Sequence, residues 1–355
     1  MESQSIENLR GEIKFREKLA RQHVSGEVLL PDYYQKDEHD QILRERVNTT
    51  IRDIEALKPQ LSSLSPFIEL GAERCQRSLV LTNDYSATGF AVDISYHQLN
   101  AAKYFAELFN RPRLPMRVCC DVGNLPFKPE AFSLAFCYQF IHHFPTPKIV
   151  IDQINRVLGD GIFFFAEEPF QGFKVSLYRQ KDSIYSKAAL RKNKLIRFIE
   201  RFISEEYCEE REYGILENDD IPIGVWLDAL SDFKHRDIRL DSLQGRISSK
   251  LGDSVSFSNF ANAVIGGSIR ATCKKQAKLQ LGSPSITARE TTAQETTALE
   301  ALLLCPDCGM EAEDVSSQTT LHRENNQLHC TSCGASFPIV NDVIILLPKA
   351  LLKEL

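Results

Sequence analysis

The stretch that decides the fold starts at Phe67-Ile68-Glu69-Leu70-Gly71 and continues through Gly89-Phe90-Ala91-Val92-Asp93 to Arg117-Val118-Cys119-Cys120-Asp121. Each segment is a short apolar run that ends at or near an acid. Stretches with helical spacing, near 76–83 and 96–109, separate the three runs. This alternation is typical of a parallel sheet covered by helices. Open parallel sheets bind ligands at the carboxyl ends of their strands, so the three acids mark a candidate binding edge.

The same pattern continues outward from this stretch. Further strands are predicted at 133–138 and 161–166, with a helix near 146–158. Two later apolar segments, near 233–240 and 268–273, are candidates for the last strands of the sheet. The sequence therefore predicts an α/β protein with a doubly wound, mostly parallel sheet.

The flanking segments suggest further units. Apolar residues at helical spacing predict N-terminal helices, and a Thr-, Ala- and Ser-rich stretch reads as a linker. A mostly helical insertion, which contains Trp226, could cover a binding cleft. The expected division is a helical segment at 1–60, a main domain at 61–275 with its insertion at about 167–232, a linker at 276–300 and a cysteine-containing module at 301–355.

Composition and charge narrow the function classes. The chain has 355 residues, 43% of them hydrophobic and 25% charged, which suits a globular protein with a large core. The net charge is −6, whereas nucleic-acid-binding proteins usually have a strongly basic surface. No apolar run reaches the length of a membrane span, and the N-terminus does not resemble a secretory signal. A cytoplasmic location without a membrane partner is expected.

The acids at the strand ends suit a nucleoside-containing ligand. An acid such as Asp93, at the end of the second strand, can accept hydrogen bonds from both ribose hydroxyls. An acid after the third strand, such as Asp121, can accept from an adenine amino group. Gly71 would let the backbone approach the ligand closely. Any single acid could instead cap a helix, but three in register favour a shared site.

These residues carry a family resemblance over roughly 66–170. Glu69-x-Gly71 and the segment 89–95 resemble the first two motifs of class I S-adenosylmethionine-dependent methyltransferases. The segments 121–127 and 132–136 resemble the third and fourth motifs, and Phe140-Ile141-His142-His143-Phe144 with 154–158 completes the pattern. The resemblance implies a Rossmann-like methyltransferase fold with S-adenosylmethionine as the cofactor.

Position by position, the resemblance implies where the cofactor would lie. Glu69 and Gly71 would lie beside its methionine part, Asp93 would bind its ribose, and Asp121 and Val122 would bind its adenine. Tyr138 and Gln139 would line the cofactor near its sulfonium, and Ile94 is a further expected cofactor-binding residue.

One departure from the family pattern concerns the loop after the first strand. Glu73 and Cys75 stand where the family usually has further glycines. A side chain there could narrow the pocket, or Glu73 could pair with the amino group of the cofactor. The loop also lacks the G-x-G-x-x-G pattern of nicotinamide enzymes, which weakens that rival interpretation.

Four residues near the same edge are candidates for acid–base chemistry. Methyl transfer from a sulfonium is an in-line displacement that depends on alignment, and an oxygen acceptor also benefits from a base. The candidate bases are His142 and His143, after the fourth strand, and Glu167 and Glu168, at the end of the fifth. One histidine could instead cap the helix that starts near Thr146. Either glutamate could hold a hydroxyl or an amine of the acceptor.

The C-terminal cysteines form two Cys-x-x-Cys pairs. Cys305 and Cys308 are followed, after 21 residues, by Cys330 and Cys333. This spacing can place four thiolates around Zn²⁺, and four sulfurs leave no open position for catalysis. A structural zinc is therefore expected. The other cysteines are expected to be buried, reduced thiols, at positions 75, 119, 120, 137, 208 and 273.

The segment 301–348 also resembles a known family of short zinc ribbons. That family includes the small activating subunit of eukaryotic tRNA, rRNA and release-factor methyltransferases, where it adds an edge strand to the sheet of its enzyme. The resemblance implies that Val343 to Leu347 could cover a sheet edge or an apolar face. Alternatively, the ribbon would recruit an acceptor macromolecule.

Taken together, the sequence predicts S-adenosylmethionine-dependent methyl transfer to a small molecule or biosynthetic intermediate. The alternatives are an RNA or protein acceptor, or a binding protein that keeps the fold without catalysis. The sequence leaves the oligomeric state open.

Overall fold

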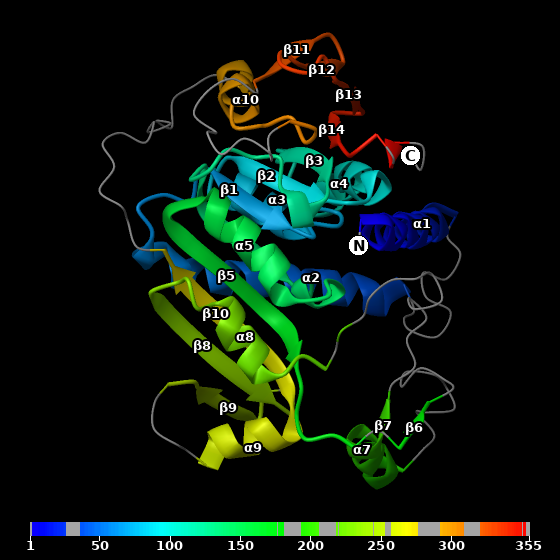
Figure 1. Ribbon diagram of the computed structural model, residues 1–355, viewed down its shortest axis with the longest axis vertical. Helices are drawn as coiled ribbons and strands as arrows, with labels where there is room; N and C mark the ends of the chain where they lie inside the picture. The colour runs from blue at the N-terminus through cyan, green and yellow to red at the C-terminus, as the bar shows by residue number, and fades with distance from the viewer. Residues whose placement is uncertain are drawn as a thin grey trace.

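The computed structural model of the chain describes residues 2–25, 36–175, 177–180, 193–205, 218, 220–243, 245–252, 257–275, 292–308, 320–349 and 351–352. A mixed sheet of twelve strands runs through the molecule in the order β11-β12-β13-β14-β3-β2-β1-β4-β5-β10-β8-β9 (Figure 1). Its strands are β1 (Phe67–Leu70), β2 (Gly89–Asp93), β3 (Met116–Cys120), β4 (Phe132–Tyr138), β5 (Leu158–Phe170), β8 (His235–Ser242), β9 (Ile247–Lys250), β10 (Gly267–Lys274), β11 (Leu321–Glu324), β12 (Gln327–Cys330), β13 (Ser336–Val340) and β14 (Val343–Leu346).

The central part of this sheet is parallel. Strands β3, β2, β1, β4 and β5 lie side by side in one direction, and β10 joins β5 antiparallel. The strand order reverses between β1 and β4, which creates the crevice where open α/β sheets bind ligands. The doubly wound, mostly parallel α/β fold predicted from the sequence is confirmed.

Helices cover both faces of the sheet. The described helices and 3-10 turns are α1 (Glu2–Ser25), α2 (Lys36–Leu57), η1 (Lys58–Gln60), α3 (Gln76–Asp84), α4 (Tyr96–Leu108), η2 (Val122–Asn124), η3 (Ile141–His143), α5 (Pro147–Val157), α7 (Lys194–Ile203), α8 (Ile223–Ala229), α9 (Phe257–Ile265) and α10 (Thr292–Glu300). Helices α5 and α8 pack on one face, and α1 to α4 pack on the other.

Alternation along the strands builds the two core layers. Ile68 and Leu70 of β1 join the core under α5, while Phe67 packs in the layer that includes α2 and α3. All four residues of β1 are buried, as expected for a parallel strand covered on both faces. Burying each large apolar side chain contributes about 1.5–3 kcal/mol, so this double layer holds the strand tips firmly.

Local caps fix the starts of two helices at the binding edge. The hydroxyl of Ser95, directly after β2, accepts a hydrogen bond from the backbone N–H of Gln98 and caps α4. Thr146 caps α5 by accepting from Lys148, and Pro147 occupies the first helical position. These caps set the directions in which the chain leaves the sheet.

The C-terminal segment extends the same sheet. Strand β14 lies parallel beside β3, with Ile344 opposite Val118 and Leu346 opposite Cys120. The antiparallel strands β13, β12 and β11 continue outward from it (Figure 1). Of the two placements that the resemblance implied for Val343 to Leu347, a sheet edge or an apolar face, residues 343–346 take the first.

Some details differ from the sequence-based expectations. Strand β5 extends beyond the predicted 161–166 at both ends, because Leu158 pairs with Phe132 of β4 and residues 168–170 pair with β10. The insertion, expected to be mostly helical, also contains the short strands β6 (Tyr178–Arg179) and β7 (Ser204–Glu205) among its described residues. Most of the predicted linker, 276–291, lies outside the described residues.

The scattered cysteines are buried and unpaired, as predicted, at positions 75, 119, 120, 137 and 273, whereas Cys208 lies outside the described residues. In the described parts of the chain, none of the helices combines the length and apolar character needed to cross a bilayer.

Candidate active site and cysteine cluster

A cavity of about 1000 Å³ lies at the carboxyl ends of the parallel strands. All the residues predicted for cofactor binding line this cavity: Glu69, Gly71, Asp93, Ile94, Asp121, Val122, Tyr138 and Gln139. Three of the four predicted catalytic residues, His142, His143 and Glu167, line it as well. The structure therefore brings the tips of five strands together around one space.

The tip of β1 supplies a buried carboxylate and a tight turn. The Glu69 carboxylate accepts hydrogen bonds from the backbone N–H of Ser78, at 2.9 Å, and from its hydroxyl. Burial raises the pKa of Glu69 to about 7. Gly71 has φ +64°, and a Cβ there would lie 2.1 Å from the ring of Phe140. Only glycine fits this position, because a side chain would be strained and would clash.

Asp93 forms the tip of β2 and is 7% exposed. Its Oδ2 accepts a hydrogen bond from the backbone N–H of Glu73 at 2.9 Å, and Oδ1 accepts from Ser95 at 2.8 Å. Burial raises the pKa of Asp93 to about 6. Each carboxylate oxygen has a second lone pair, so Asp93 can accept further hydrogen bonds from a ligand while it holds both loops.

Asp121 follows β3 and starts the turn η2. Its Oδ1 accepts a hydrogen bond from the backbone N–H of Gly123 at 2.8 Å, and burial raises its pKa. The next residue, Val122, is buried and adds an apolar surface to the cavity. This pairing of an acceptor with an apolar wall suits a planar base that carries an amino group.

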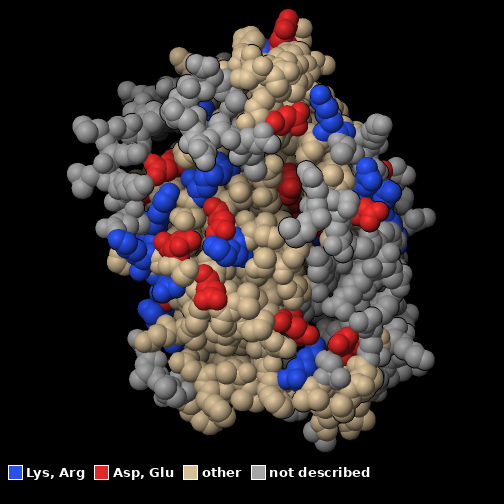
Figure 2. Space-filling model, viewed as in Figure 1, with Lys and Arg blue, Asp and Glu red and all other residues tan. Residues whose placement is uncertain are grey.

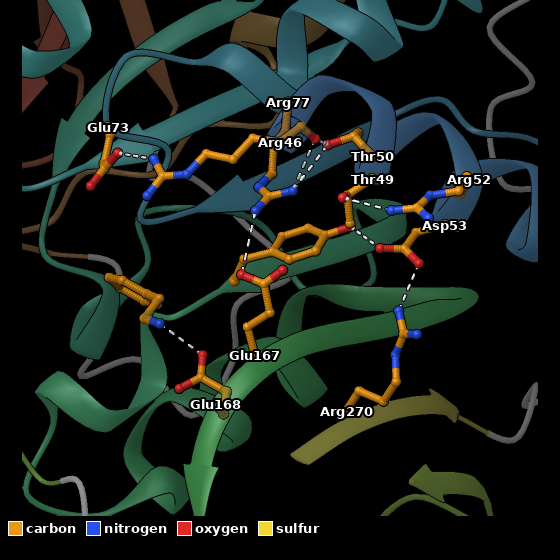
Figure 3. A network of polar contacts seen from close by, with 12 residues as sticks. Arg46, Thr49, Thr50, Arg52, Asp53, Glu73, Arg77, Glu167, Glu168 and Arg270 are labelled. Atoms are coloured by element: carbon orange, nitrogen blue, oxygen red, sulfur yellow. Dashed lines mark hydrogen bonds and ion pairs between the residues drawn. The ribbon is translucent and has the colours of Figure 1, made fainter. Parts of the chain in front are cut away.

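Tyr138, at the tip of β4, contacts Asp53 and Arg77, which belong to the network of polar contacts in Figure 3. Its hydroxyl donates a hydrogen bond to Asp53 Oδ2 at 2.9 Å, and Arg270 Nη2 donates to Asp53 Oδ1 at 2.6 Å. The guanidinium of Arg77 stacks on the Tyr138 ring, 3.4 Å from its centroid. Arg77 Nη2 also lies 3.9 Å from Glu167 Oε2. The network ties α2, α3, β4, β5 and β10 to one wall of the cavity.

Glu168, the fourth predicted catalytic residue, does not line the cavity. It is 0% exposed, and its Oε1 accepts from the backbone N–H groups of Phe140 and Ile141 at 2.7 and 3.0 Å. Its Oε2 accepts from the backbone N–H of His142 at 3.2 Å and lies 2.9 Å from His142 Nδ1. Glu168 therefore supports His142 and the turn η3 from behind, whereas Glu167 faces the cavity.

The two histidines lie together on η3, with ring centroids 4.3 Å apart. His142 is 8% exposed, and both histidines line the cavity. The Glu168 carboxylate can only accept, so Nδ1 carries a proton and donates it, and in the neutral imidazole Nε2 is then the acceptor nitrogen. Such an imidazole can accept a proton from a hydroxyl or amine.

The N-terminal helices add a charged group that the sequence interpretation missed. Arg46 Nη1 of α2 lies 3.2 Å from Glu73 Oε2, and Arg16 Nη1 of α1 lies 3.5 Å from Glu73 Oε1. Arg16 Nε also donates to Glu12 Oε1 at 2.8 Å. All four residues line the cavity. No motif marks Glu12, Arg16 or Arg46 in the sequence, and only Glu73, at a glycine position, stood out.

The four C-terminal cysteines form a cluster in which all four Sγ atoms lie within 4.8 Å of one another. Cys305 Sγ is 3.7 Å from Cys333 Sγ, and Cys308 Sγ is 3.7 Å from Cys330 Sγ. A tetrahedral zinc with Zn–S bonds of about 2.3 Å requires S–S separations of about 3.8 Å. The donor set and its spacing therefore fit Zn²⁺.

Comparison with known proteins agrees with this architecture. Residues 68–165 match the family model described as a methyltransferase domain. A search of curated proteins finds no match to the chain. The matched segment holds β1 to β4 and the first part of β5, so the likeness to a methyltransferase domain lies in the central parallel strands.

Several solved structures show a distant likeness. A methyltransferase of Thermotoga maritima is 11% identical, with a TM-score of 0.38, over 68% of this chain and 95% of that one. Geranyl diphosphate C-methyltransferase of Streptomyces coelicolor is 11% identical, with a TM-score of 0.39, over 63% and 77%. A chain from the complex of the Haloferax volcanii Trm112 methyltransferase activator with a methyltransferase is 13% identical, with a TM-score of 0.39, over 67% and 94%.

Proposed function

We propose that this protein binds S-adenosylmethionine in the cavity at the strand tips and transfers its methyl group to a small-molecule acceptor. The observation that carries the proposal is the convergence of Glu69, Asp93 and Asp121 on one cavity of about 1000 Å³. Pockets of several hundred to about 1000 Å³ hold nucleoside-sized ligands, so this space has room for a cofactor and a small acceptor.

The lining residues fit the parts of this cofactor. Asp93 offers its carboxylate to the ribose hydroxyls, and Asp121 with Val122 offers an acceptor and an apolar wall to the adenine. Gly71 leaves the backbone accessible, and its lack of a Cβ makes room for Phe140. When bound, the cofactor supplies an electrophilic methyl group on a sulfonium.

The residues of the chain itself would align and activate the acceptor. His142, held by Glu168, is placed to take a proton from the acceptor through Nε2. Glu167 faces the cavity and can hold a hydroxyl or amine in line. General bases of this kind contribute roughly 10²–10⁴-fold to a rate. Phe140, Phe144 and Pro145 supply apolar surface that limits water around the reacting atoms.

The distribution of charge favours a small acceptor over a nucleic acid. Figure 2 shows acidic and basic side chains interspersed over the described part of one face, in keeping with the net charge of −6. Nucleic-acid binding depends on a continuous basic surface that contacts phosphates. A cavity lined by carboxylates, arginines, histidines and aromatic rings better suits a compact molecule than a polyanion.

We further propose that the four-cysteine cluster holds a structural zinc ion. Four thiolates would complete the coordination of the metal, so the ion would stabilise the C-terminal strands and take no part in the reaction. Through β14 it would also stabilise β3 and the residues that follow it.

Calorimetry with S-adenosylmethionine and S-adenosylhomocysteine tests the proposed activity at its first step. The wild-type protein should bind both, and Asp93→Ala should weaken binding by about tenfold to a hundredfold because hydrogen bonds to a charged group are lost. Asp228→Ala, an exposed aspartate of α8, is the matched control and should bind normally. Absence of binding by the wild-type protein at millimolar ligand would reject the proposal.

Cofactor affinity should also depend on pH. Asp93 accepts ribose hydroxyls best when ionised, and its pKa is raised by burial to about 6. As the pH falls from 8 to 5, most of the carboxyl becomes protonated, so the affinity for S-adenosylhomocysteine should fall about tenfold. Asp93→Ala should lose this part of the dependence. An equally steep dependence in the variant would assign it to another group, such as Glu69.

A further inference from the structure

The loop between β1 and α3 keeps an unusual backbone while it carries side chains. Gly71, Glu73 and Cys75 have φ values of +64°, +45° and +61°. Such left-handed conformations favour glycine, and other residues adopt them at a cost in free energy. Glu73 therefore occupies a backbone position suited to glycine, and this position brings its carboxylate to the cavity.

The Glu73 carboxylate lies beside charged residues of α1 and α2, and Figure 3 shows its contact with Arg46. It contacts Arg46 of α2 at 3.2 Å and Arg16 of α1 at 3.5 Å, and Arg16 contacts Glu12 at 2.8 Å. Burial raises the pKa of Glu73, but Arg46 and Arg16 outweigh burial and lower it to about 2. Glu73 is therefore ionised throughout the working range of pH.

We propose that Glu73, Arg46 and Arg16 recognise the α-amino acid end of the cofactor, with Glu73 binding its ammonium group and the arginines binding its carboxylate. This inference rests on the proposed function. Glu73, which stands where the family usually has a glycine, would then help to select the ligand.

The order of the strands supports this placement. Asp121, Asp93 and Gly71 follow β3, β2 and β1, which are neighbours in the sheet. A ligand whose adenine lies at Asp121 and whose ribose lies at Asp93 therefore directs its remaining end toward the loop after β1. The backbone N–H of Glu73 donates to Asp93, so the Glu73 side chain starts directly beside the ribose position.

The charges of the cluster match a zwitterion. Glu12 and Glu73 contribute two negative charges, and Arg16 and Arg46 contribute two positive charges, so these four side chains are neutral together. The ammonium of a zwitterion would meet Glu73 and its carboxylate would meet Arg46 and Arg16, so each end would face an opposite charge. The side chains of Glu73 and Arg46 are 37% and 35% exposed, so both are accessible to a ligand.

Three adenosine ligands distinguish recognition of the ammonium group from recognition of the carboxylate. S-adenosylhomocysteine carries both the ammonium and the carboxylate, decarboxylated S-adenosylmethionine carries only the ammonium, and methylthioadenosine carries neither. Calorimetry should show that Glu73→Gln weakens the first two by about tenfold or more and leaves methylthioadenosine within about twofold. Arg46→Gln should weaken only S-adenosylhomocysteine by a similar factor.

Glu55→Gln is the matched control, because Glu55 lies on the exposed side of α2 and also loses one carboxylate. Methylthioadenosine binding by each variant verifies that the nucleoside part of the site is folded. The inference would be overturned if Glu73→Gln kept its affinity for S-adenosylhomocysteine, or if it lost affinity equally for all three ligands. The cluster would then serve only to hold α1 and α2 against the loop after β1. If the wild-type protein bound none of the three ligands, the proposed function itself would fail.

Discussion

Removal of zinc from the four-cysteine cluster is expected to unfold the C-terminal strands and to open the edge of the sheet at β3. Small zinc modules gain on the order of 10–16 kcal/mol from their metal, which is comparable to the whole stability of a typical domain. Cys305 and Cys330 are buried, and their module contributes Leu328 and Phe337 to the main core. Losing the metal would therefore remove support from the core as well as from the ribbon.

Loss of the zinc ion should also affect the proposed cofactor site. The backbone N–H of Leu304 donates to the carbonyl of Pro126, and that of Lys128 donates to Leu302, both at 2.9 Å. These bonds hold the segment that follows Asp121. On the same side, Asn341 Nδ2 donates to the hydroxyl of Tyr96 at 2.7 Å, close to Asp93 in the chain. Zinc loss should therefore lower cofactor affinity as well as stability.

Cys308→Ser tests this prediction together with chelation of the wild-type protein. Metal analysis should find about one zinc per wild-type chain and much less in the variant. Hydrogen exchange should become fast in β14 and in β3, and the unfolding midpoint should fall by well over 10 °C. Cys273→Ala, which removes a buried thiol of β10, is the matched control and should keep its zinc. Slow exchange in β3 after complete zinc removal would contradict a supporting role for the metal.

The elements that were predicted most accurately are those that the local sequence pattern determines. Strand β2 was predicted at 89–93 and observed at Gly89–Asp93, because a short apolar run bounded by turn residues is recognisable in the sequence. The acids at the tips followed, since Glu69 and Asp93 lie in the last two residues of β1 and β2, and Asp121 directly follows β3. The family resemblance implied only that Val343 to Leu347 could cover a sheet edge or an apolar face. The pairing of β14 with β3 was not predicted, because nothing local tells an edge strand which edge it will join.

The residues that were missed depend on contacts between distant segments. Asp53 and Arg270 are 217 positions apart and meet at 2.6 Å. No spacing rule links them. The roles of Glu167 and Glu168 also needed the structure. Glu167 has φ +63° and lies at an irregularity in the pairing of β5 with β10, so regular strand alternation does not tell which carboxylate faces the ligand. The side chain of Glu167 is 43% exposed, while Glu168 is fully buried.

Replacement of Glu168 is expected to have the second-largest effect. Its carboxylate meets three backbone N–H groups and His142 Nδ1 in a site that excludes water. In Glu168→Ala, these donors lose their acceptor, and each buried unsatisfied group costs about 1–3 kcal/mol. Partial relaxation of η3 should reduce the total, so we expect the free energy of unfolding to fall by about 3–5 kcal/mol.

A matched pair of variants separates packing from hydrogen bonding. Glu168→Gln keeps the size of the side chain but turns an amide NH₂ toward the donors, so it should recover only part of the lost stability. Glu167→Gln changes the neighbouring carboxylate, which faces the cavity and lies 3.9 Å from Arg77, and should cost less than about 1 kcal/mol. Chemical denaturation of the three variants should therefore rank Glu168→Ala as the least stable and Glu167→Gln as closest to the wild-type protein.

Nuclear magnetic resonance can then show whether Glu168 also positions the candidate base. In the wild-type protein, the ¹⁵N resonances of His142 should report a proton on Nδ1, and the amides of residues 140–142 should exchange slowly. In Glu168→Gln, the tautomers should mix and these amides should exchange faster, because the carboxylate that orders them is gone. A wild-type tautomer in this variant would mean that Glu168 supports the turn without orienting the imidazole. If stability were also unchanged in Glu168→Ala, the buried carboxylate would have no supporting role at this site.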